Sequence, residues 1–320
     1  MSGILEMPKP LEQLHESDIE RKCCIGKVLT NSLKHLTQRF MDCDFEWLLP
    51  VVFSKSTDPL WPDPGASIEK RIELEIYGET VRATSSMIIH KMVACSLAHP
   101  RLFILSPNIR IERRERARTG RHIYEFTQLD FEVRNATSKE IKRLVETVLS
   151  GLIGDLKREL REELTYLERY RSLRAPEMPF REYPRRELEK KYGTGWERRL
   201  VSEIRDPVWV TDIPREFYDF EDFETGAWDN YDLFLPQYGE VLSGARREWE
   251  HDKIIRKMER DNGIKKENYA LLLKLAKECR MKPSAGAGIG VERLVGWIAG
   301  AQHLGETQLF PKIPGVVYDL

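Results

Sequence analysis

Two segments with a two-residue alternation of apolar and polar side chains constrain the fold of this chain most: LFILSPNIRIE at 102–112 and YEFTQLDFEV at 124–133. Successive side chains of a β-strand point to opposite faces. The second segment therefore has an apolar face, and an opposite face with Phe126, Gln128, Asp130 and Glu132. We expect two antiparallel strands, each burying one face. The charged face is either solvated surface or the floor of a ligand site, and the pattern alone does not choose.

The rest of the chain predicts an α+β fold with a mostly antiparallel sheet. Apolar periodicity predicts helices at 17–42, 85–98, 137–156, 245–260, 268–279 and 291–301, and strands at 47–53, 72–78, 208–213 and 230–236. LWPDPG (60–65) is predicted to be a loop. The regular strand–helix alternation of a doubly wound fold is absent. We expect one catalytic domain over 1–320, with 169–206 as an insertion.

Charge and cysteine content exclude several classes of protein. The 51 Lys+Arg and 52 Asp+Glu leave a net charge of -1, which gives no general attraction to nucleic acid or to an anionic membrane. No apolar run reaches membrane-spanning length, and the N-terminus does not resemble a secretory signal. Five cysteines without a CxxC pair predict reduced thiols and a cytoplasmic protein: Cys23, Cys24, Cys43, Cys95 and Cys279.

Local charge is far less even. Residues 110–121 hold six Arg and two Glu, whereas residues 212–224 hold six acids and one Arg. Each run alone is typical of a solvated surface. Together they could be a cationic wall for phosphates and an acidic region for a metal ion or a cationic substrate.

Two further motifs carry candidate chemistry. GAGIGVER (286–293) spaces its glycines as GxGxG, which does not match the dinucleotide-binding motif, and no GK[ST] follows. Its glycines either allow a close strand–helix approach or, with Arg293, contact a nucleotide. In NYDLFLPQYGEVLSGARREWE (230–250), Asp232 and Glu240 are compatible with Mg²⁺, which proteins hold by one or two carboxylates plus substrate phosphates.

Taken in order, these segments resemble the catalytic core of class II aminoacyl-tRNA synthetases, in the aspartate/asparagine branch. The first helix and WLLP, ending at Pro50, are similar to the first motif of the family, which forms its dimer interface. NIRIE, the Arg-rich loop and RHIYEFTQLDFE are similar to the second, and GAGIGVER to the third. The resemblance covers about residues 20–314.

The resemblance implies a set of site residues. ATP is expected to contact Arg110, Glu112, Arg121, His122, Phe126, Glu240 and Arg293. Aspartate and ammonia are expected at Ser86, Lys91, Gln128, Asp130, Ser243 and Arg247. Mg²⁺ is expected at Asp232, Glu240 and Ser243, and the catalytic residues are expected to be Arg110, Gln128, Asp130 and Arg247.

Individual roles follow from the same resemblance. Arg110 is expected at the α-phosphate, and Arg121 and His122 near the distal phosphates. Phe126 and Arg293 are expected to sandwich adenine. Glu112 is expected near the adenine amino group. Lys91 and Arg247 are expected at the aspartate carboxylates. Gln128 and Asp130 are expected at the aspartate ammonium or at the incoming ammonia.

Within this branch, tRNA-charging enzymes carry an N-terminal OB-fold domain of ~100 residues. The first motif here begins within about 20 residues of Met1, so we expect no such domain. TDPLWPDP (57–64), SMIIHK (86–91), PREFYD (214–219) and REWE (247–250) resemble archaeal asparagine synthetases related to asparaginyl-tRNA synthetase. The implied enzyme is a homodimer that converts aspartate, ammonia and ATP to asparagine, AMP and pyrophosphate, with no tRNA partner.

Two alternatives stay open. One is a truncated synthetase paralogue that aminoacylates tRNA or another acceptor. It is favoured by the extra arginines of the loop and by Leu242, where relatives often have a serine. The other is a binding protein that has lost catalysis, which the intact Arg110, Glu112, Glu240 and Arg293 disfavour.

Overall fold

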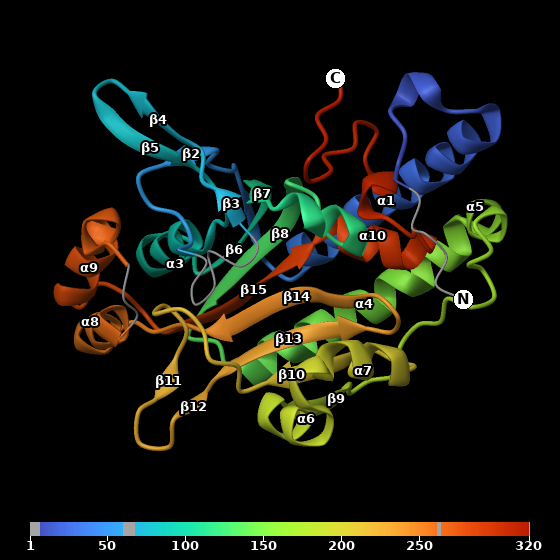
Figure 1. Cartoon of the computed structure of the whole chain (residues 1–320). Coiled ribbons are helices and arrows are strands. Elements are labelled where there is room, and N and C mark those ends of the chain that lie inside the picture. Colours follow the sequence, from blue (N-terminus) through green and yellow to red (C-terminus); the bar gives the residue numbers. More distant parts are fainter. Residues whose placement is uncertain (1–6, 60–67, 261–263, 320) are drawn as a thin grey trace.

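An eight-stranded sheet forms the centre of the chain in the computed structural model, which describes residues 7–59, 68–260 and 264–319 (Figure 1). The strand order is β1-β6-β8-β15-β14-β13-β10-β9. Their bounds are β1 Glu46–Leu48, β6 Arg101–Ile109, β8 Glu125–Arg134, β15 Ser284–Gly290, β14 Gly239–Arg246, β13 Asn230–Leu235, β10 Val208–Thr211 and β9 Arg181–Pro184. The inner pairings are antiparallel and only the pairs β1–β6 and β10–β9 at the two edges are parallel, as the predicted fold class requires.

The main core lies where helices cover one face of this sheet. α1 (Glu16–Asp42), α4 (Ser138–Glu159) and α10 (Val291–Ala299) contribute their apolar faces to one cluster, which also contains Leu129, Phe131 and Val133 of β8. A capping box starts α4, because the Thr137 side chain accepts from the Glu140 backbone N–H and the Glu140 carboxylate accepts from the Thr137 backbone N–H. The apolar face of β8 is thus the core face.

The opposite, polar face of β8 lies toward a second group of elements. α3 (Ile88–Leu97) packs on β8, and its apolar residues share a core with α8 (His251–Arg260) and α9 (Ala270–Lys277), at the left of Figure 1. Small sheets flank this group: β2 (Phe53–Ser54), β5 (Glu79–Ala83) and β4 (Glu73–Ile76); β3 (Ile68–Lys70) with β7 (Ile111–Glu112); and β11 (Glu221–Asp222) with β12 (Ala227–Trp228). The polar face is therefore enclosed between the sheet and these elements.

The predicted insertion extends the sheet. β9 pairs with β10, and α6 (Arg185–Tyr192) and α7 (Trp196–Glu203) form an apolar cluster over these edge strands. The short α5 (Arg161–Tyr166) precedes this segment. Single 3₁₀ turns occur at η1 Leu11–Gln13, η2 Arg114–Thr119, η3 Gly193–Gly195, η4 Lys266–Tyr269 and η5 Leu304–Thr307. The boundary of the insertion stays a prediction.

Several sequence expectations are wrong in detail. The strand expected at 47–53 is two short strands, β1 and β2, which leave Pro50 between them, since proline lacks the N–H that a ladder requires. The helix expected at 245–260 starts only at His251, because residues up to Arg246 pair with β15 and continue β14. The predicted loop at 60–65 lies outside the described residues.

The glycine motif is itself a strand. AGAGIG forms most of β15 between β8 and β14, and it leads into α10 as expected. A Cβ on Gly286 would lie 2.2 Å from the Phe131 carbonyl oxygen, so the close approach of neighbouring backbones requires glycine.

None of the helices in the described ranges combines the length and the apolar composition needed to cross a membrane.

Candidate active site

A cavity of about 220 Å³ lies at the end of β8 and β15, and it brings together all seven residues predicted to contact ATP. These are Arg110, Glu112, Arg121, His122, Phe126, Glu240 and Arg293; Gln128 lines the same cavity. They come from β8, from the Arg-rich connection before it, from β14 and from α10, so only the folded sheet makes them neighbours. Whether each contacts ATP stays a prediction.

Arginines dominate the wall of this cavity. The Arg110 guanidinium lies 5.1 Å from the centre of the Phe126 ring, and its Nε donates to the Ser85 carbonyl at 3.1 Å. Arg293 donates to the Glu240 carbonyl at 2.9 Å and lies 3.5 Å from its carboxylate. Fixed guanidinium groups of this kind suit phosphate oxygens, because they offer planar pairs of donors.

Burial and charge set the protonation of two wall residues. Burial, together with the surrounding arginines, lowers the pKa of His122 to about 3. The imidazole is therefore neutral near pH 7 and adds no positive charge to the wall. Burial raises the pKa of Glu112 even though Arg110, Arg116 and Arg293 lie near it.

A buried charged cluster lies under Gln128 on the same face of β8. Lys91 Nζ, from α3, donates to Asp130 Oδ1 and to the Ala287 carbonyl, both at 2.9 Å, and lies 3.8 Å from Glu132 Oε2. Glu132 also accepts from Ser284 Oγ at 2.8 Å.

Arg247 is the second cation of this cluster. Its Nε lies 3.2 and 3.4 Å from the two Glu132 oxygens, its Nη1 donates to Asp219 Oδ1 at 2.7 Å, and its Nη2 donates to the Gly286 carbonyl at 3.1 Å. The guanidinium is thus bonded to protein on every nitrogen. The prediction that it binds a substrate carboxylate stays a prediction, and its observed role is to hold Glu132 and Asp219.

The cluster lacks one positive charge. Two cations, Lys91 and Arg247, face three anions, Asp130, Glu132 and Asp219, and all five are at most 4% exposed. Asp130 Oδ2 is buried and has no hydrogen-bond partner among the residues that the structure describes. A buried carboxylate oxygen without a donor is costly, so this atom favours a ligand that brings N–H groups and positive charge.

Gly288 connects the cluster to the cavity. It lines the cavity, and a Cβ at this position would lie 2.9 Å from Asp130 Oδ1 and 3.0 Å from Gln128 Nε2. Gln128 accepts from Asn108 at 2.9 Å, which orients its amide. Ser86, also predicted to bind substrate, lies at the start of α3, where its Oγ accepts from the Ile88 N–H at 3.2 Å.

The predicted metal ligands lie on β13 and β14. Asp232 and Ser243 are cross-strand partners, and Glu240 lies three residues before Ser243. Burial raises the pKa of Asp232 to about 7, with the nearby Glu240 acting in the same direction and Arg215 opposing it. No group of three or more His, Cys, Asp or Glu among the described residues could hold a metal ion. Asp232 Oδ1 is nevertheless buried without a hydrogen-bond partner in the described part of the chain, and these hard oxygen donors fit Mg²⁺ shared with phosphates.

Arg215 is the main site residue that sequence reasoning missed. Its two terminal nitrogens donate to Asp232 Oδ2 and to Ser243 Oγ. It was visible in the sequence as the only arginine of the acidic run at 212–224. Glu132 was visible through the alternation of β8, whereas Asp219 follows from no local pattern, because its partner Arg247 is distant in sequence.

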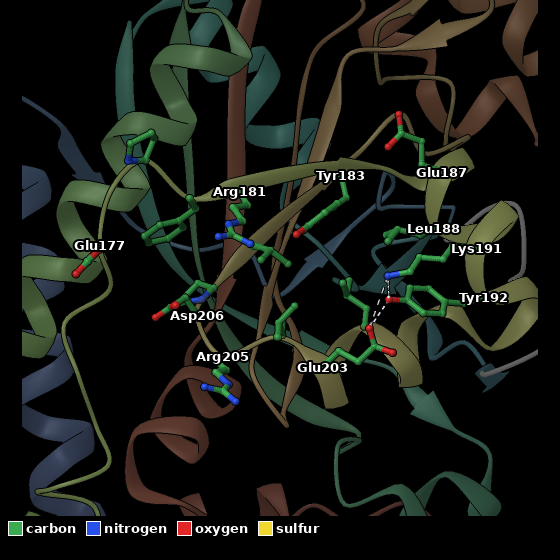
Figure 2. Close-up of a pocket in the computed structure, with 16 residues that line it drawn as sticks. Glu177, Arg181, Tyr183, Glu187, Leu188, Lys191, Tyr192, Glu203, Arg205 and Asp206 are labelled. Atoms are coloured by element: carbon green, nitrogen blue, oxygen red, sulfur yellow. Dashed lines mark hydrogen bonds and ion pairs between the residues drawn. The ribbon is translucent and has the colours of Figure 1, made fainter.

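A second, larger hollow of about 650 Å³ lies in the 169–206 region and includes none of the predicted site residues (Figure 2). β9, α6, α7 and the start of β10 form it. Figure 2 shows Lys191, Tyr192 and Glu203 linked along one side; Lys191 Nζ lies 2.5 Å from the Tyr192 hydroxyl, which donates to Glu203. Its charged residues are exposed and of both signs, whereas the smaller cavity is lined by four arginines together with buried Glu112 and Glu292. The smaller cavity is the better candidate for chemistry.

Comparisons with known proteins agree with this choice. Residues 72–314 match the family described as tRNA synthetases class II (D, K and N). The aspartate–tRNA(Asp/Asn) ligase of Methanopyrus kandleri is 30% identical over 243 residues, which are 70% of this chain and 54% of that protein. The asparagine–tRNA ligase of Thermococcus kodakarensis is 28% identical over 68% of this chain and 54% of that protein. The chain spans about half the length of these curated relatives.

The fold is shared with a solved structure. Asparaginyl-tRNA synthetase from Pyrococcus horikoshii, complexed with asparaginyl-adenylate, aligns with a TM-score of 0.79 at 22% identity, covering 98% of this chain and 76% of that one. The family match spans most of the chain and includes the cavity, the charged cluster and the glycine strand. The chain therefore belongs to the class II tRNA synthetases of the D, K and N type, which are ATP-using ligases.

Proposed function

We propose that this protein is an asparagine synthetase that joins aspartate and ammonia at the expense of ATP, giving asparagine, AMP and pyrophosphate through a β-aspartyl-adenylate. The relatives described above are named for aspartate and asparagine, and the Pyrococcus structure is described with an asparaginyl-adenylate. These names support an amino-acid substrate of about this size here.

The observation that carries the proposal is the unpartnered Asp130 Oδ2 beside Lys91. The buried cluster has a net charge of -1, so it favours a ligand that brings an ammonium group. The adjoining Lys91 suits a carboxylate. An amino acid with an α-ammonium and two carboxylates satisfies both demands, and the cluster adjoins the arginine-lined cavity through Gly288.

The chemistry follows in two steps. An oxygen of the aspartate β-carboxylate attacks the α-phosphorus of ATP, and the bond to pyrophosphate breaks. The ammonia lone pair then attacks the β-carbonyl carbon, the nitrogen loses a proton, and the bond to AMP breaks. Arg110 would stabilise the charge that builds on the α-phosphate, and Gln128 and Asp130 would orient the nitrogen groups. Asp232, Glu240 and Ser243 would hold Mg²⁺, whose chemistry is to offset phosphate charge.

We also propose a homodimer through the segment around Pro50. Trp47, Leu49, Val52 and Phe53 are 50%, 89%, 43% and 40% exposed, so they form an apolar surface that a second copy would cover. Light scattering of the intact protein and of Leu49→Glu tests this assignment, since a charge there should favour monomers. A monomeric intact protein would refute it.

The Arg-rich connection favours a second candidate, a ligase that transfers the activated amino acid to tRNA. Arg113, Arg114 and Arg118 are exposed on or beside η2, next to the cavity wall. Exposed arginines of this kind suit a polyanion.

One assay separates the two. The protein is supplied with ATP, Mg²⁺, aspartate and ammonium, with and without tRNA, and asparagine and AMP are measured. We expect asparagine without tRNA, in equal amount to AMP. Aspartyl-tRNA formed only when tRNA is added, with no asparagine in its absence, would establish the second candidate instead.

A further inference from the structure

Arg215 lies where a cation is expected in the metal site. It comes from the segment between β10 and β11 and contacts both Asp232 Oδ2 and Ser243 Oγ, which are cross-strand partners. The side chains of Arg215 and Asp232 are 18% and 6% exposed. The pair is therefore little screened by solvent, and it neutralises the carboxylate in the structure.

The second oxygen of the same carboxylate has no hydrogen-bond partner within the described ranges. Asp232 is thus half satisfied, by the guanidinium on one oxygen only. A divalent ion that approaches the other oxygen is repelled by the positive charge of Arg215, which lies on the opposite side of the same carboxylate. Solvent screens this repulsion poorly. Because a guanidinium is always charged, this repulsion cannot be relieved by loss of a proton.

Phosphate oxygens would relieve it. They are strong acceptors for a guanidinium, and they also bring negative charge that offsets a divalent ion. Arg215 can therefore exchange Asp232 for phosphate when a nucleotide enters the neighbouring cavity, which Glu240 also lines.

We infer that Arg215 is a latch on the metal site. Without nucleotide, its guanidinium is bonded to Asp232 and Ser243 and excludes the divalent ion. The ion binds Asp232 only together with the triphosphate. This inference rests on the proposed function, because it takes Asp232 as a metal ligand. It adds that the protein binds its metal with the nucleotide and not before it.

Mn²⁺ binding to the nucleotide-free protein, followed by the electron paramagnetic resonance of the free ion, tests the latch without an activity assay. Arg215→Gln should bind one Mn²⁺ at least about tenfold more tightly than the intact protein, because the repelling charge is gone. Arg215→Gln combined with Asp232→Asn should lose that gain. Arg158→Gln, which removes an exposed arginine bonded to Asp155 at 2.6 Å on α4, is the matched control and should behave as the intact protein does.

A second comparison uses no Arg215 variant and decides the matter if that variant does not fold. With Arg215 in place, Asp232→Asn should leave nucleotide-free Mn²⁺ binding unchanged, because the carboxylate is already masked. Weaker binding in Asp232→Asn, or no gain in a folded Arg215→Gln, would overturn the latch.

The proposed metal site is tested separately with Mn²⁺ and a non-hydrolysable ATP analogue. Asp232→Asn should weaken binding of that complex. If it does not, the metal assignment in the proposed function is wrong and the latch falls with it. If it does, while Arg215→Gln shows no gain, only the latch is wrong.

Discussion

Two carboxylates on the same face of β8 should respond in opposite ways to the same chemical change. Asp130→Asn removes one negative charge from a buried cluster that holds three anions and two cations. Lys91 keeps the Ala287 carbonyl and the amide oxygen as acceptors, so the cost in stability should be about 1 kcal/mol. The lost partner of a substrate ammonium is a charged hydrogen bond of about 1.5–3 kcal/mol, which raises the KM for aspartate roughly 10- to 150-fold.

Glu132→Gln should do the reverse. Glu132 is fully buried and accepts from both Arg247 and Ser284, so an amide there replaces the ion pair with Arg247 and sets an NH2 group among buried donors. Breaking such a pair costs about 3–5 kcal/mol. At about 1.5 °C per kcal/mol for a chain of 320 residues, the melting temperature should fall by about 4–8 °C.

Thermal unfolding and the aspartate dependence of AMP formation, measured side by side, check this pair. We expect Asp130→Asn to melt within about 2 °C of the intact protein and to require far more aspartate. If Asp130→Asn unfolds as early as Glu132→Gln, or if its KM for aspartate is unchanged, the idea that the unpartnered oxygen belongs to the substrate is wrong.

Three further predictions concern the cavity wall. Gly288→Ala places a Cβ 2.9 Å from Asp130 Oδ1 and should raise the KM for aspartate, whereas Gly290→Ala meets nothing closer than 3.5 Å and should be tolerated; equal kinetics in the two variants would refute the steric reasoning. Burial raises the pKa of Glu292 from 4.5 to about 7, so the folded state keeps a proton that the unfolded chain releases, and stability is lost as pH rises from 4.5 to 7. Glu292→Gln should remove this loss and add up to about 3 kcal/mol at pH 8, checked by urea unfolding at pH 5 and pH 8; no gain at the higher pH would contradict it. Arg110→Ala should lower AMP formation by about 100-fold or more with little change in melting temperature, and near-normal turnover would show that the wall is misassigned.

The sequence was informative where chemistry follows a local period. The alternation of β8 placed Gln128, Asp130 and Glu132 on one face, and the structure shows that face enclosed by α3. The capping box of α4 and the long helix α1 were likewise readable from neighbouring residues. These features depend on side chains a few positions apart, which a sequence displays directly.

The sequence failed where position depends on distant partners. Nothing near Arg215 indicates that it bridges Asp232 and Ser243, since a loop after β10 brings it there. The glycines of 286–290 were expected to allow a strand–helix approach or to contact a nucleotide, whereas Gly286 faces the backbone of β8, a partner that lies far away in the sequence. The strand expected around Pro50 is divided because β1 pairs with β6 and β2 pairs with β5, which belong to different sheets.

The alternating glycines of β15 set the depth of the proposed amino-acid pocket. Ala285, Ala287 and Ile289 fill the core side of this strand, while Gly286 and Gly288 leave room on the other side for Glu132 and for Asp130. The pocket is therefore deeper at these two positions than it would be if either residue carried a side chain. Glycine-to-alanine changes along this strand during evolution could therefore restrict such a pocket to shorter substrates. The charged residues around it would not have to change.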